Sequence, residues 1–471
     1  MNLYAGLPLG VQALFWIALA GTIWMFATVI VLAILAARGR RTGTVMQPHA
    51  DDDDLLWVFV VPALNEAVTI ADSVDRLIAT HANNAVILVV DDASTDDTAN
   101  ILDGITDRRL EVLHRTAPDA RLGKADALNA AFRHLISEVL PRPAFRRWSA
   151  ARVIVGVVDA DGRLDPDAPA AIAPYFADPE VGGVQSLVRI YNRRGWLTWA
   201  QDVEFRSFGF LFQAGRSRWG SANMGGNGQF TRLSALVQIA DADGPWRHRL
   251  TEDQDLGVRL LQAGWRSHQE NSVTVQQQGL NSLRRLYRQR ARWAQGAWQA
   301  LSLLPGSGGL RALPVAARAD AIGYLLTPIL QLIIGISIVL SAVMSTTGSS
   351  YEPVQWWLGL VFVTIGFGPG IVTLANRAPT LWAALTAIPL AIPYALYAWV
   401  LLPTNAIGLL RHVLGRHTWS KTPREPIRSS PIEVPDRIRG RARHQGLRLG
   451  AEARQARHAR LQHLGARVQG L

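Results

Sequence analysis

The sequence contains no cysteine, and this absence excludes disulfide bonds, a catalytic thiolate and a zinc site with cysteine ligands. Lysine is almost as scarce, since Lys124 and Lys421 are the only two among 48 lysines and arginines. Arginine is therefore the usual cation, and a lysine indicates a position that favours a compact ammonium group over a planar guanidinium. We expect this of Lys124, whereas chance explains Lys421 equally well.

The formal net charge of +11 is concentrated at one end of the 471-residue chain. Residues 411–471 contain fourteen Lys and Arg against four Asp and Glu, so the rest of the protein is close to neutral. This distribution does not indicate a nucleic-acid-binding protein, and we predict no nucleic-acid partner. Basic tails of this kind contact anionic lipid or nucleic acid, or are simply solvated. The Arg-, Pro-, Gly- and Gln-rich composition predicts a disordered tail.

Four apolar runs predict membrane-spanning helices, because each is close to or longer than the ~20 residues that cross a bilayer. The runs are 11–37, 322–344, 354–375 and 381–402. Arginines within 38–41 follow the first run and place the next segment in the cytoplasm by the positive-inside tendency. Three further spans would leave the basic tail outside, so either one segment is re-entrant or the tendency fails here.

Residues 55–279 predict a soluble α/β domain. Apolar runs predict buried strands at 57–61, 85–90 and 152–158. We expect Pro62 to stop the first strand and a helix to lie within 122–140. Continuous apolar strands that alternate with helices indicate a mostly parallel sheet covered on both faces. Ligands bind at the carboxyl ends of such strands, and Asp92 and Asp159 directly follow two of them.

The whole chain is thus predicted to contain six segments. They are a transmembrane helix (11–37), a cytoplasmic linker (38–54), the α/β domain (55–279), amphipathic interface helices (280–321), a transmembrane region of about three spans (322–410) and the basic tail (411–471). Residues 280–321 predict two amphipathic helices, the first with an aromatic and aliphatic face beside many arginines. Such a face suits the membrane surface, packing against the α/β domain, or both.

Two pairs of acidic residues follow predicted strands. Asp159 and Asp161 can hold a hard divalent cation together with diphosphate oxygens. The alternative is an ordinary turn in which an aspartate caps the next helix. The second pair, Asp91 and Asp92, favours the functional interpretation, in which one carboxylate accepts hydrogen bonds from a base or ribose.

Two further motifs open predicted helices. Lys124 lies in a first helical turn, where it can neutralise a phosphate or contact a nucleotide, unless it is an ordinary surface lysine. Asp253, within the motif 251–253, can act as a general base for an acceptor hydroxyl if a desolvated site holds it. The alternative is a helix cap made by Thr251 with acids in the first turn.

The segment 289–293 is the most specific short motif. Arg292 can clamp a leaving diphosphate, and Trp293 can stack on the face of a sugar ring. The alternative is a membrane-surface helix with an ordinary tryptophan anchor. Its place after the acidic motifs and before the apolar runs favours the functional interpretation.

These motifs together resemble the family 2 glycosyltransferases, and most closely the membrane-bound processive branch that includes cellulose, chitin, hyaluronan and poly-N-acetylglucosamine synthases. The motifs are 61–66, 89–98, 123–129, 159–161, 251–253 and 289–293. The resemblance implies an α/β domain of GT-A fold, an inverting reaction, a UDP-sugar donor and Mg²⁺ or Mn²⁺. It implies site residues near the nucleotide-sugar (Glu66, Asp92, Lys124, Asp159), at the metal (Asp159, Asp161), as base (Asp253), and at the acceptor and diphosphate (Gln289, Arg292, Trp293).

The resulting hypothesis is transfer from UDP-glucose or UDP-N-acetylglucosamine to a growing β-linked polysaccharide, with the α/β domain on the cytoplasmic side of the plasma (inner) membrane. The expected partners are the UDP-sugar, a polysaccharide or lipid acceptor, and membrane lipids. Residues 224–232 depart from the processive pattern, and the tail lacks the strand pattern of a cyclic-dinucleotide-binding barrel. A glycolipid synthase with a lipid acceptor therefore remains open, as does a non-catalytic membrane scaffold.

Overall fold

The computed structural model describes residues 6–41, 54–346, 356–376, 380–416 and 425. Most of the predicted linker and nearly all of the predicted basic tail lie outside these residues. The fold below is that of the described part of residues 1–426, which form one compact unit.

Eight strands form a single mixed sheet in the order β3-β2-β1-β4-β7-β6-β8-β5. They are β1 (Leu56–Ala63), β2 (Ala85–Asp91), β3 (Leu110–His114), β4 (Val153–Val157), β5 (Arg163–Leu164), β6 (Val181–Ile190), β7 (Gln229–Arg232) and β8 (Arg266–Gln277). β1 is parallel to β2 and to β4, and β2 is parallel to β3. β6 and β8 are parallel, and β7 runs antiparallel to both β4 and β6. The predicted mostly parallel α/β sheet is confirmed.

The prediction that Pro62 stops the first strand is wrong. β1 continues to Ala63, and Pro62 pairs with Val90 of β2. The Ala63 carbonyl accepts a hydrogen bond from the N–H of Asp92, which follows β2. Because the backbone groups of successive strand residues point to opposite sides, the Pro62 nitrogen faces β4. The pairing of β1 with β4 ends at Val60, so the missing N–H of the proline removes no bond from that ladder.

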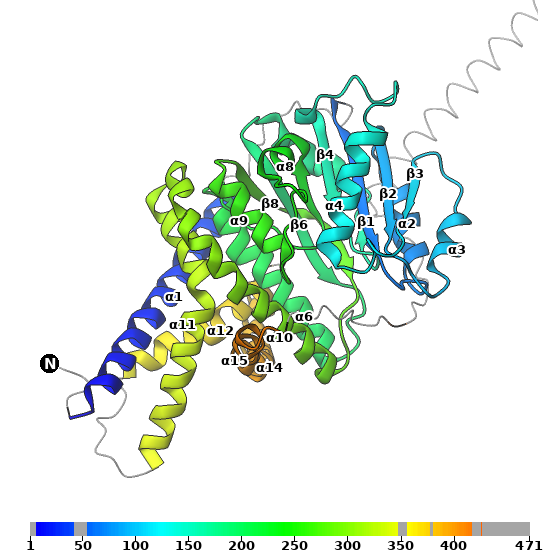
Figure 1. Cartoon of the computed structure of the whole chain (residues 1–471). Helices are drawn as coiled ribbons and strands as arrows, with labels where there is room; N and C mark the ends of the chain where they lie inside the picture. The colour runs from blue at the N-terminus through cyan, green and yellow to red at the C-terminus, as the bar shows by residue number, and fades with distance from the viewer. Residues whose placement is uncertain (1–5, 42–53, 347–355, 377–379, 417–424, 426–471) are drawn as a thin grey trace, which may run out of the picture. The chain divides into compact units, whose positions relative to one another are not determined.

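Helices cover both faces of the parallel part of the sheet (Figure 1). On one face lie α2 (Ile70–Ile78), α3 (Thr98–Asp103) and α5 (Ala168–Ile172), and on the other lie α4 (Lys124–His134), α8 (Leu233–Ile239) and α9 (Glu252–Gln262). Side chains of β1 alternate between the two cores, with Phe59 in the first and Val58 in the second. This alternation explains why the strand is apolar at every position.

Four helical segments connect these layers to the apolar helices, namely α6 (Trp196–Ser207), the π-helical turn Phe208–Gln213, α7 (Ala214–Ser217) and α10 (Leu283–Ala300). The π-helical turn Leu135–Val139 and the 3₁₀ turns Ala150–Arg152 and Ala173–Ala177 lie within the sheet domain. α10 is the first of the two amphipathic helices expected in 280–321. The second is not an α-helix, because Leu301–Ala312 form 3₁₀ turns that contain Pro305 and three glycines. Proline and glycine disfavour a continuous α-helix there.

The remaining helices are apolar. They are α1 (Leu9–Arg41), α11 (Val315–Thr346), α12 (Trp356–Ala375), α13 (Leu381–Leu385), α14 (Ala387–Leu401) and α15 (Pro403–Val413). Within the described ranges, three stretches are long and apolar enough to cross a membrane, namely Leu9–Gly39, Val315–Met344 and Ala387–Val413, and Val363–Ala375 is a shorter apolar helix. The predicted run at 381–402 is divided at Thr386, between α13 and α14.

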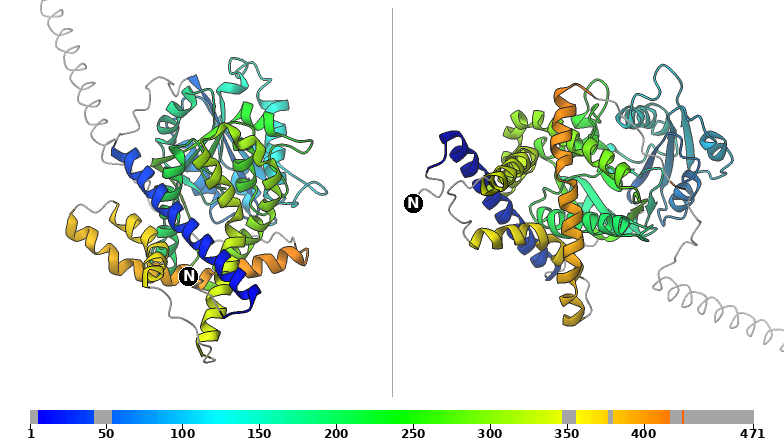
Figure 2. Two further views of the ribbon diagram at one scale, coloured as in Figure 1. Left: turned by 90° about the vertical axis from the view of Figure 1, so that its left-hand side faces the viewer. Right: turned by 90° about the horizontal axis from the view of Figure 1, so that it is seen from below.

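The apolar helices pack against the rest of the protein at small residues. α1 runs alongside α11 in both views of Figure 2, and a Cβ added to Gly323 of α11 would lie 2.5 Å from the Trp24 ring of α1. A buried ion pair joins α7 to α11, with Arg216 Nε 2.7 Å from Asp320 Oδ2. This ion pair therefore ties the long apolar helix α11 directly to the domain at 55–279.

Candidate active site

A cavity of about 460 Å³ lies beside the carboxyl ends of β1 and β4. All nine residues predicted for the site line it, namely Glu66, Asp92, Lys124, Asp159, Asp161, Asp253, Gln289, Arg292 and Trp293. The structure therefore brings together residues that are separated by more than 200 positions in the sequence. The volume is within the ordinary range for small-molecule sites.

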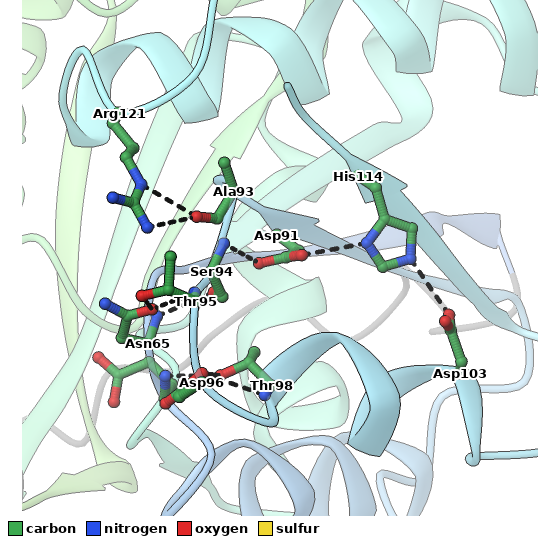
Figure 3. Close-up of polar contacts among 11 residues, drawn as sticks. Asn65, Asp91, Ala93, Ser94, Thr95, Asp96, Thr98, Asp103, His114 and Arg121 are labelled. Carbon is green, nitrogen blue, oxygen red and sulfur yellow. Dashed lines mark hydrogen bonds and ion pairs between the residues drawn. The ribbon is translucent and has the colours of Figure 1, made fainter. Parts of the chain in front are cut away.

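The loops that follow β1, β2 and β3 are bonded to one another at one end of this cavity (Figure 3). The Asn65 N–H donates to Ser94 Oγ at 2.9 Å, and the Thr95 N–H donates to Asn65 Oδ1 at 2.7 Å. The Arg121 guanidinium donates twice to the Ala93 carbonyl, at 2.9 and 2.7 Å. Asn65, Ala93 and Arg121 all have positive φ, at 53°, 60° and 64°. These bonds hold three strained backbone positions in place.

The two neighbouring aspartates after β2 have different surroundings. Asp91 Oδ1 accepts the Ser94 N–H, and Asp91 Oδ2 pairs with His114 Nδ1 at 3.1 Å (Figure 3). His114 Nε2 pairs in turn with Asp103 Oδ1 at 3.1 Å. The hydrogen bond to Asp91, with that to Asp103, raises the pKa of His114 above its usual value. Asp91 thus fixes the loop, whereas Asp92 lines the cavity.

Asp92 is held by a residue that sequence reasoning missed. Arg115 Nη1 donates to Asp92 Oδ1 at 2.6 Å, and both side chains are buried. Burial raises the pKa of Asp92, against the opposing effects of the Arg121 backbone and the Arg115 charge. Arg115 directly follows β3, so the rule that parallel strand ends converge could have found it.

Lys124 begins α4 and points into a group of acceptors. Its Nζ lies 2.6 Å from Asp159 Oδ1, 2.8 Å from the Gly226 carbonyl and 3.5 Å from Glu252 Oε1. Burial alone would lower the pKa of Lys124, but the nearby carboxylates outweigh it and raise the pKa. The ammonium group therefore neutralises the carboxylates at the centre of the cavity.

Asp159 and Asp161 fit one side of a divalent cation site. Both carboxylates line the cavity, and Asp161 Oδ2 is oriented by the Gln278 N–H at 2.9 Å. In the described part of the chain, no group of three or more His, Asp or Glu side chains is placed to hold a metal. A hard cation bound here would take its other ligands from diphosphate and water, as is usual for Mg²⁺.

Asp253 lies in the first turn of α9 and lines the same cavity. Burial, followed by the neighbouring Glu252, raises the pKa of Asp253 to about 7, while Lys124 acts in the opposite direction. The helix-cap alternative is weakened, because Thr251 occupies the cap position without a capping hydrogen bond from its side chain. A carboxyl group with this pKa suits proton transfer near neutrality.

The other end of the cavity is formed by helices. Gln289, Arg292 and Trp293 of α10 line it, together with residues that carried no sequence signal. Gly226 and Asn227, within the segment 224–232 that departs from the processive pattern, also line the cavity. The missed lining residues include Glu204 and Phe205 of α6 and Tyr324 of α11. They come from long-range packing, so no short motif marks them. Tyr324 belongs to a helix that is apolar enough to cross a membrane.

Comparison with known proteins agrees with this architecture. The family model described as "Glycosyltransferase like family 2" matches residues 57–296. The beta-monoglucosyldiacylglycerol synthase of Synechocystis sp. is 32% identical over 246 residues, covering 51% of this chain and 47% of the relative. The poly-beta-1,6-N-acetyl-D-glucosamine synthase of Staphylococcus aureus is 27% identical over 295 residues, covering 62% of this chain and 64% of the relative.

The chain thus spans about half the length of the cyanobacterial relatives that it matches. Among solved structures, a mannosyltransferase from Pyrobaculum calidifontis in complex with GDP-Man and Mn²⁺ superposes with a TM-score of 0.58. The two are 19% identical, and the match covers 86% of this chain and 99% of the other, which supports a GT-A fold. Because the family model covers half of the sequence and includes the sheet and every lining residue of the cavity except Tyr324, the chain belongs to glycosyltransferase family 2.

Proposed function

We propose that the protein is an inverting glycosyltransferase that moves a sugar from a UDP-sugar, UDP-glucose or UDP-N-acetylglucosamine, to a growing β-linked polysaccharide at the membrane. The observation that carries this proposal is the single cavity lined by all nine predicted residues. The names of the relatives add glucosyl and N-acetylglucosaminyl products to the candidate chemistry.

The proposed reaction uses Asp253 as the base. Its carboxylate takes the proton of an acceptor hydroxyl, whose oxygen attacks the anomeric carbon of the donor sugar. The bond from that carbon to the diphosphate oxygen breaks, and UDP leaves from the opposite face. An α-linked donor then gives a β-linked product. The pKa of Asp253 near 7 allows a large fraction of the group to be the carboxylate at neutral pH.

The donor end of the cavity would bind UDP. Glu66 and Asp92 are proposed to hold the nucleoside, and Arg292 with Lys124 the diphosphate. Mg²⁺ or Mn²⁺ held by Asp159 and Asp161 would supply positive charge to the leaving diphosphate. The ion pair between Lys124 and Asp159 supports this proposal, because it holds a positive charge where the diphosphate would bind.

We also propose that the protein is integral to the plasma (inner) membrane, with the domain at 55–279 on the cytoplasmic side. The three long apolar stretches support membrane insertion, and the arginines after the first stretch support this orientation.

A glycolipid synthase is the second candidate. Three relatives named beta-monoglucosyldiacylglycerol synthase are 32%, 33% and 32% identical to this chain over the matched residues. Tyr324 also brings a long apolar helix to the cavity wall, where a lipid acceptor would arrive. Both candidates share the donor chemistry and differ only in the acceptor.

A donor screen tests the proposal. Membranes with the full chain are incubated with each UDP- or GDP-sugar in Mn²⁺, and nucleotide release is measured beside membranes with Asp253→Asn. We expect release with one UDP-sugar in the wild type alone, and a radiolabelled product whose size separates polymer from glycolipid. Equal release from the two membranes with every donor would overturn the proposal.

A further inference from the structure

A buried arginine lies directly behind the acceptor end of the cavity. Arg290 belongs to the same motif as Gln289, Arg292 and Trp293, but it is 7% exposed and does not line the cavity. Its guanidinium contacts Glu204 of α6, and its Nη2 donates to Tyr397 Oη of α14 at 3.3 Å. A buried guanidinium is costly unless it is paired, so this arrangement specifies one geometry for three helices.

The same guanidinium fixes two more residues of the cavity wall. Arg290 Nη1 donates to Gln289 Oε1 at 2.9 Å. The Arg290 Cζ lies 4.1 Å from the centroid of the Trp293 ring, which is a cation–π contact. Phe205 packs edge-on against Trp293, with centroids 6.3 Å apart. Arg290 therefore covers one face of the indole, so a ligand in the cavity would have to stack on the opposite face.

Glu204 presents an acceptor beside that indole. Its Oε2 takes the bonds from both Arg290 and Tyr397, the latter at 2.7 Å. Its Oε1 has no hydrogen-bond donor among the described residues, although the side chain lines the cavity and is 34% exposed. A charged oxygen that is held in place and directed at a cavity is expected to bind a hydroxyl or amide N–H of a ligand.

We propose that Glu204 adds a hydrogen-bonding subsite for a hydroxylated sugar ring of the acceptor beside Trp293, and that Arg290 is the positioning residue of this subsite. The carboxylate accepts a hydrogen bond from a ring hydroxyl while the ring stacks on the indole. This inference rests on the proposed transferase function and deepens it, because it assigns a glycosyl group, rather than a bare lipid hydroxyl, to the acceptor end.

The membrane helix α14 takes part in this subsite without contacting the ligand. Tyr397 is 2% exposed, and its hydroxyl donates to the same oxygen of Glu204 that Arg290 binds. Removal of this hydroxyl should loosen Glu204 while leaving the cavity lining unchanged. Tyr397→Phe therefore separates positioning from direct contact.

Glu204→Gln in the full chain, purified in detergent, is the main test. With the UDP-sugar found active in the donor screen, two products are measured, namely sugar incorporated into product and free sugar from hydrolysis. We expect incorporation to fall about tenfold or more, since a hydrogen bond to a charged group is lost. Hydrolysis and the Kd for UDP in Mn²⁺ should stay within about twofold of wild type.

Companion variants separate this effect from loss of structure. Tyr397→Phe should lower incorporation about threefold through the acceptor KM, and Arg290→Lys should retain more incorporation than Arg290→Met. Glu111→Gln is the matched control, because Glu111 also pairs with an arginine, Arg142, but lies outside the cavity lining. It should behave as wild type.

The outcomes separate a failure of this inference from a failure of the proposed transferase function. A wild type that releases no nucleotide with any donor overturns the proposed function. If the wild type is active and incorporation is unchanged in Glu204→Gln and Tyr397→Phe, the subsite alone is overturned. A product formed on a lipid hydroxyl with no glycosyl group would overturn it as well. A parallel loss of UDP affinity in Glu204→Gln would also overturn it, because Glu204 would then serve the donor.

Discussion

The two ends of the cavity are built in different ways. The donor end consists of loops that follow adjacent parallel strands, and these loops are bonded to one another through main-chain groups and short side chains. The acceptor end consists of α6, α10 and α11, and the ion pair between the buried Arg290 and Glu204 joins α10 to α6. A strand end fixes a side chain locally, whereas helix packing fixes it through distant partners.

This difference fits the separate roles that we propose for the two ends. Nucleotide binding needs a constant geometry, and a twisted sheet with bonded loops would provide it. The acceptor end contacts helices that are long and apolar enough to cross a membrane, so its geometry depends on their packing. We therefore expect variants at the donor end to change nucleotide binding, and variants at the acceptor end to change transfer.

The largest expected effect is that of Asp253→Asn, at the junction of the two ends. An amide cannot take the acceptor proton, so transfer should fall about 10²- to 10⁴-fold, the usual contribution of a general base. The Kd for UDP, measured by calorimetry in Mn²⁺, should stay close to wild type. Transfer at the wild-type rate would remove Asp253 from the base role.

Removal of divalent cations should be the next largest effect and should act on the donor end. Chelation with EDTA is expected to lower nucleotide release roughly 100-fold, and Mn²⁺ or Mg²⁺ should restore it. Asp161→Asn should require a higher Mn²⁺ concentration for half-maximal activity. The control is Asp167→Asn, a half-exposed carboxylate that pairs with His81 away from the cavity. An unchanged Mn²⁺ requirement in Asp161→Asn would contradict the site.

Arg216→Met tests how firmly α11, which contributes Tyr324 to the acceptor end, is tied to α7. The substitution leaves Asp320 buried without its partner and should cost about 3 kcal/mol of unfolding free energy. It should lower the midpoint of thermal unfolding in detergent. Arg266→Met is the matched control, because the pairs of Arg266 with Asp178 and Glu180 are exposed and should contribute under about 1 kcal/mol. Equal midpoints for the two variants would contradict this account.

The pH profile of transfer tests the surroundings of Asp253. The carboxyl group must be deprotonated to act, so kcat/KM should fall about tenfold per pH unit below the pKa near 7. The negative charge of Glu252 raises this pKa, and Glu252→Gln should therefore move the inflection to lower pH. An inflection that moves upward, or does not move, would show that another group controls the profile.

The smallest expected effect is at the loops of the donor end. Asn65→Ala removes the acceptor of the Thr95 N–H and strains a backbone with φ of 53°. We expect the donor KM to rise about three- to tenfold with little change in kcat. Asn65→Gly relieves the strain but also lacks the acceptor, so comparison of the two variants separates the two causes. A change in kcat alone would contradict a donor-binding role.

Part of the donor end could be predicted from the sequence, because Asp92 and Asp159 follow apolar strands and Lys124 opens a helix. Asp92 and Asp159 were placed in one cavity by the convergence of parallel strand ends alone. The sequence wrongly predicts that the first strand stops at Pro62, because a proline stops a strand only where its nitrogen faces a continuing ladder of hydrogen bonds. That distinction depends on the partner strand and is absent from the local sequence.

The acceptor end could be predicted only through the motif at 289–293. Glu204, Phe205 and Tyr324 reach the cavity from helices that are distant in the sequence, and nothing near them indicates a site. The role of Arg290 was hidden for a similar reason, because neighbouring positions on a helix face different surroundings. Contacts between helices decide which residue of a motif lines the cavity and which one supports it.

Because lysine is scarce, the donor end can be labelled selectively at Lys124. An amine-reactive reagent can acylate only Lys124, Lys421 and the amino terminus, so the peptide that contains Lys124 reports on the cavity by mass spectrometry. Nearby carboxylates raise the pKa of Lys124, and its labelling should therefore be slow compared with that of an ordinary lysine. In the proposed complex the diphosphate lies beside this ammonium group, so a bound UDP-sugar should slow the labelling further, and the rate at this one amine would indicate when the donor end is occupied.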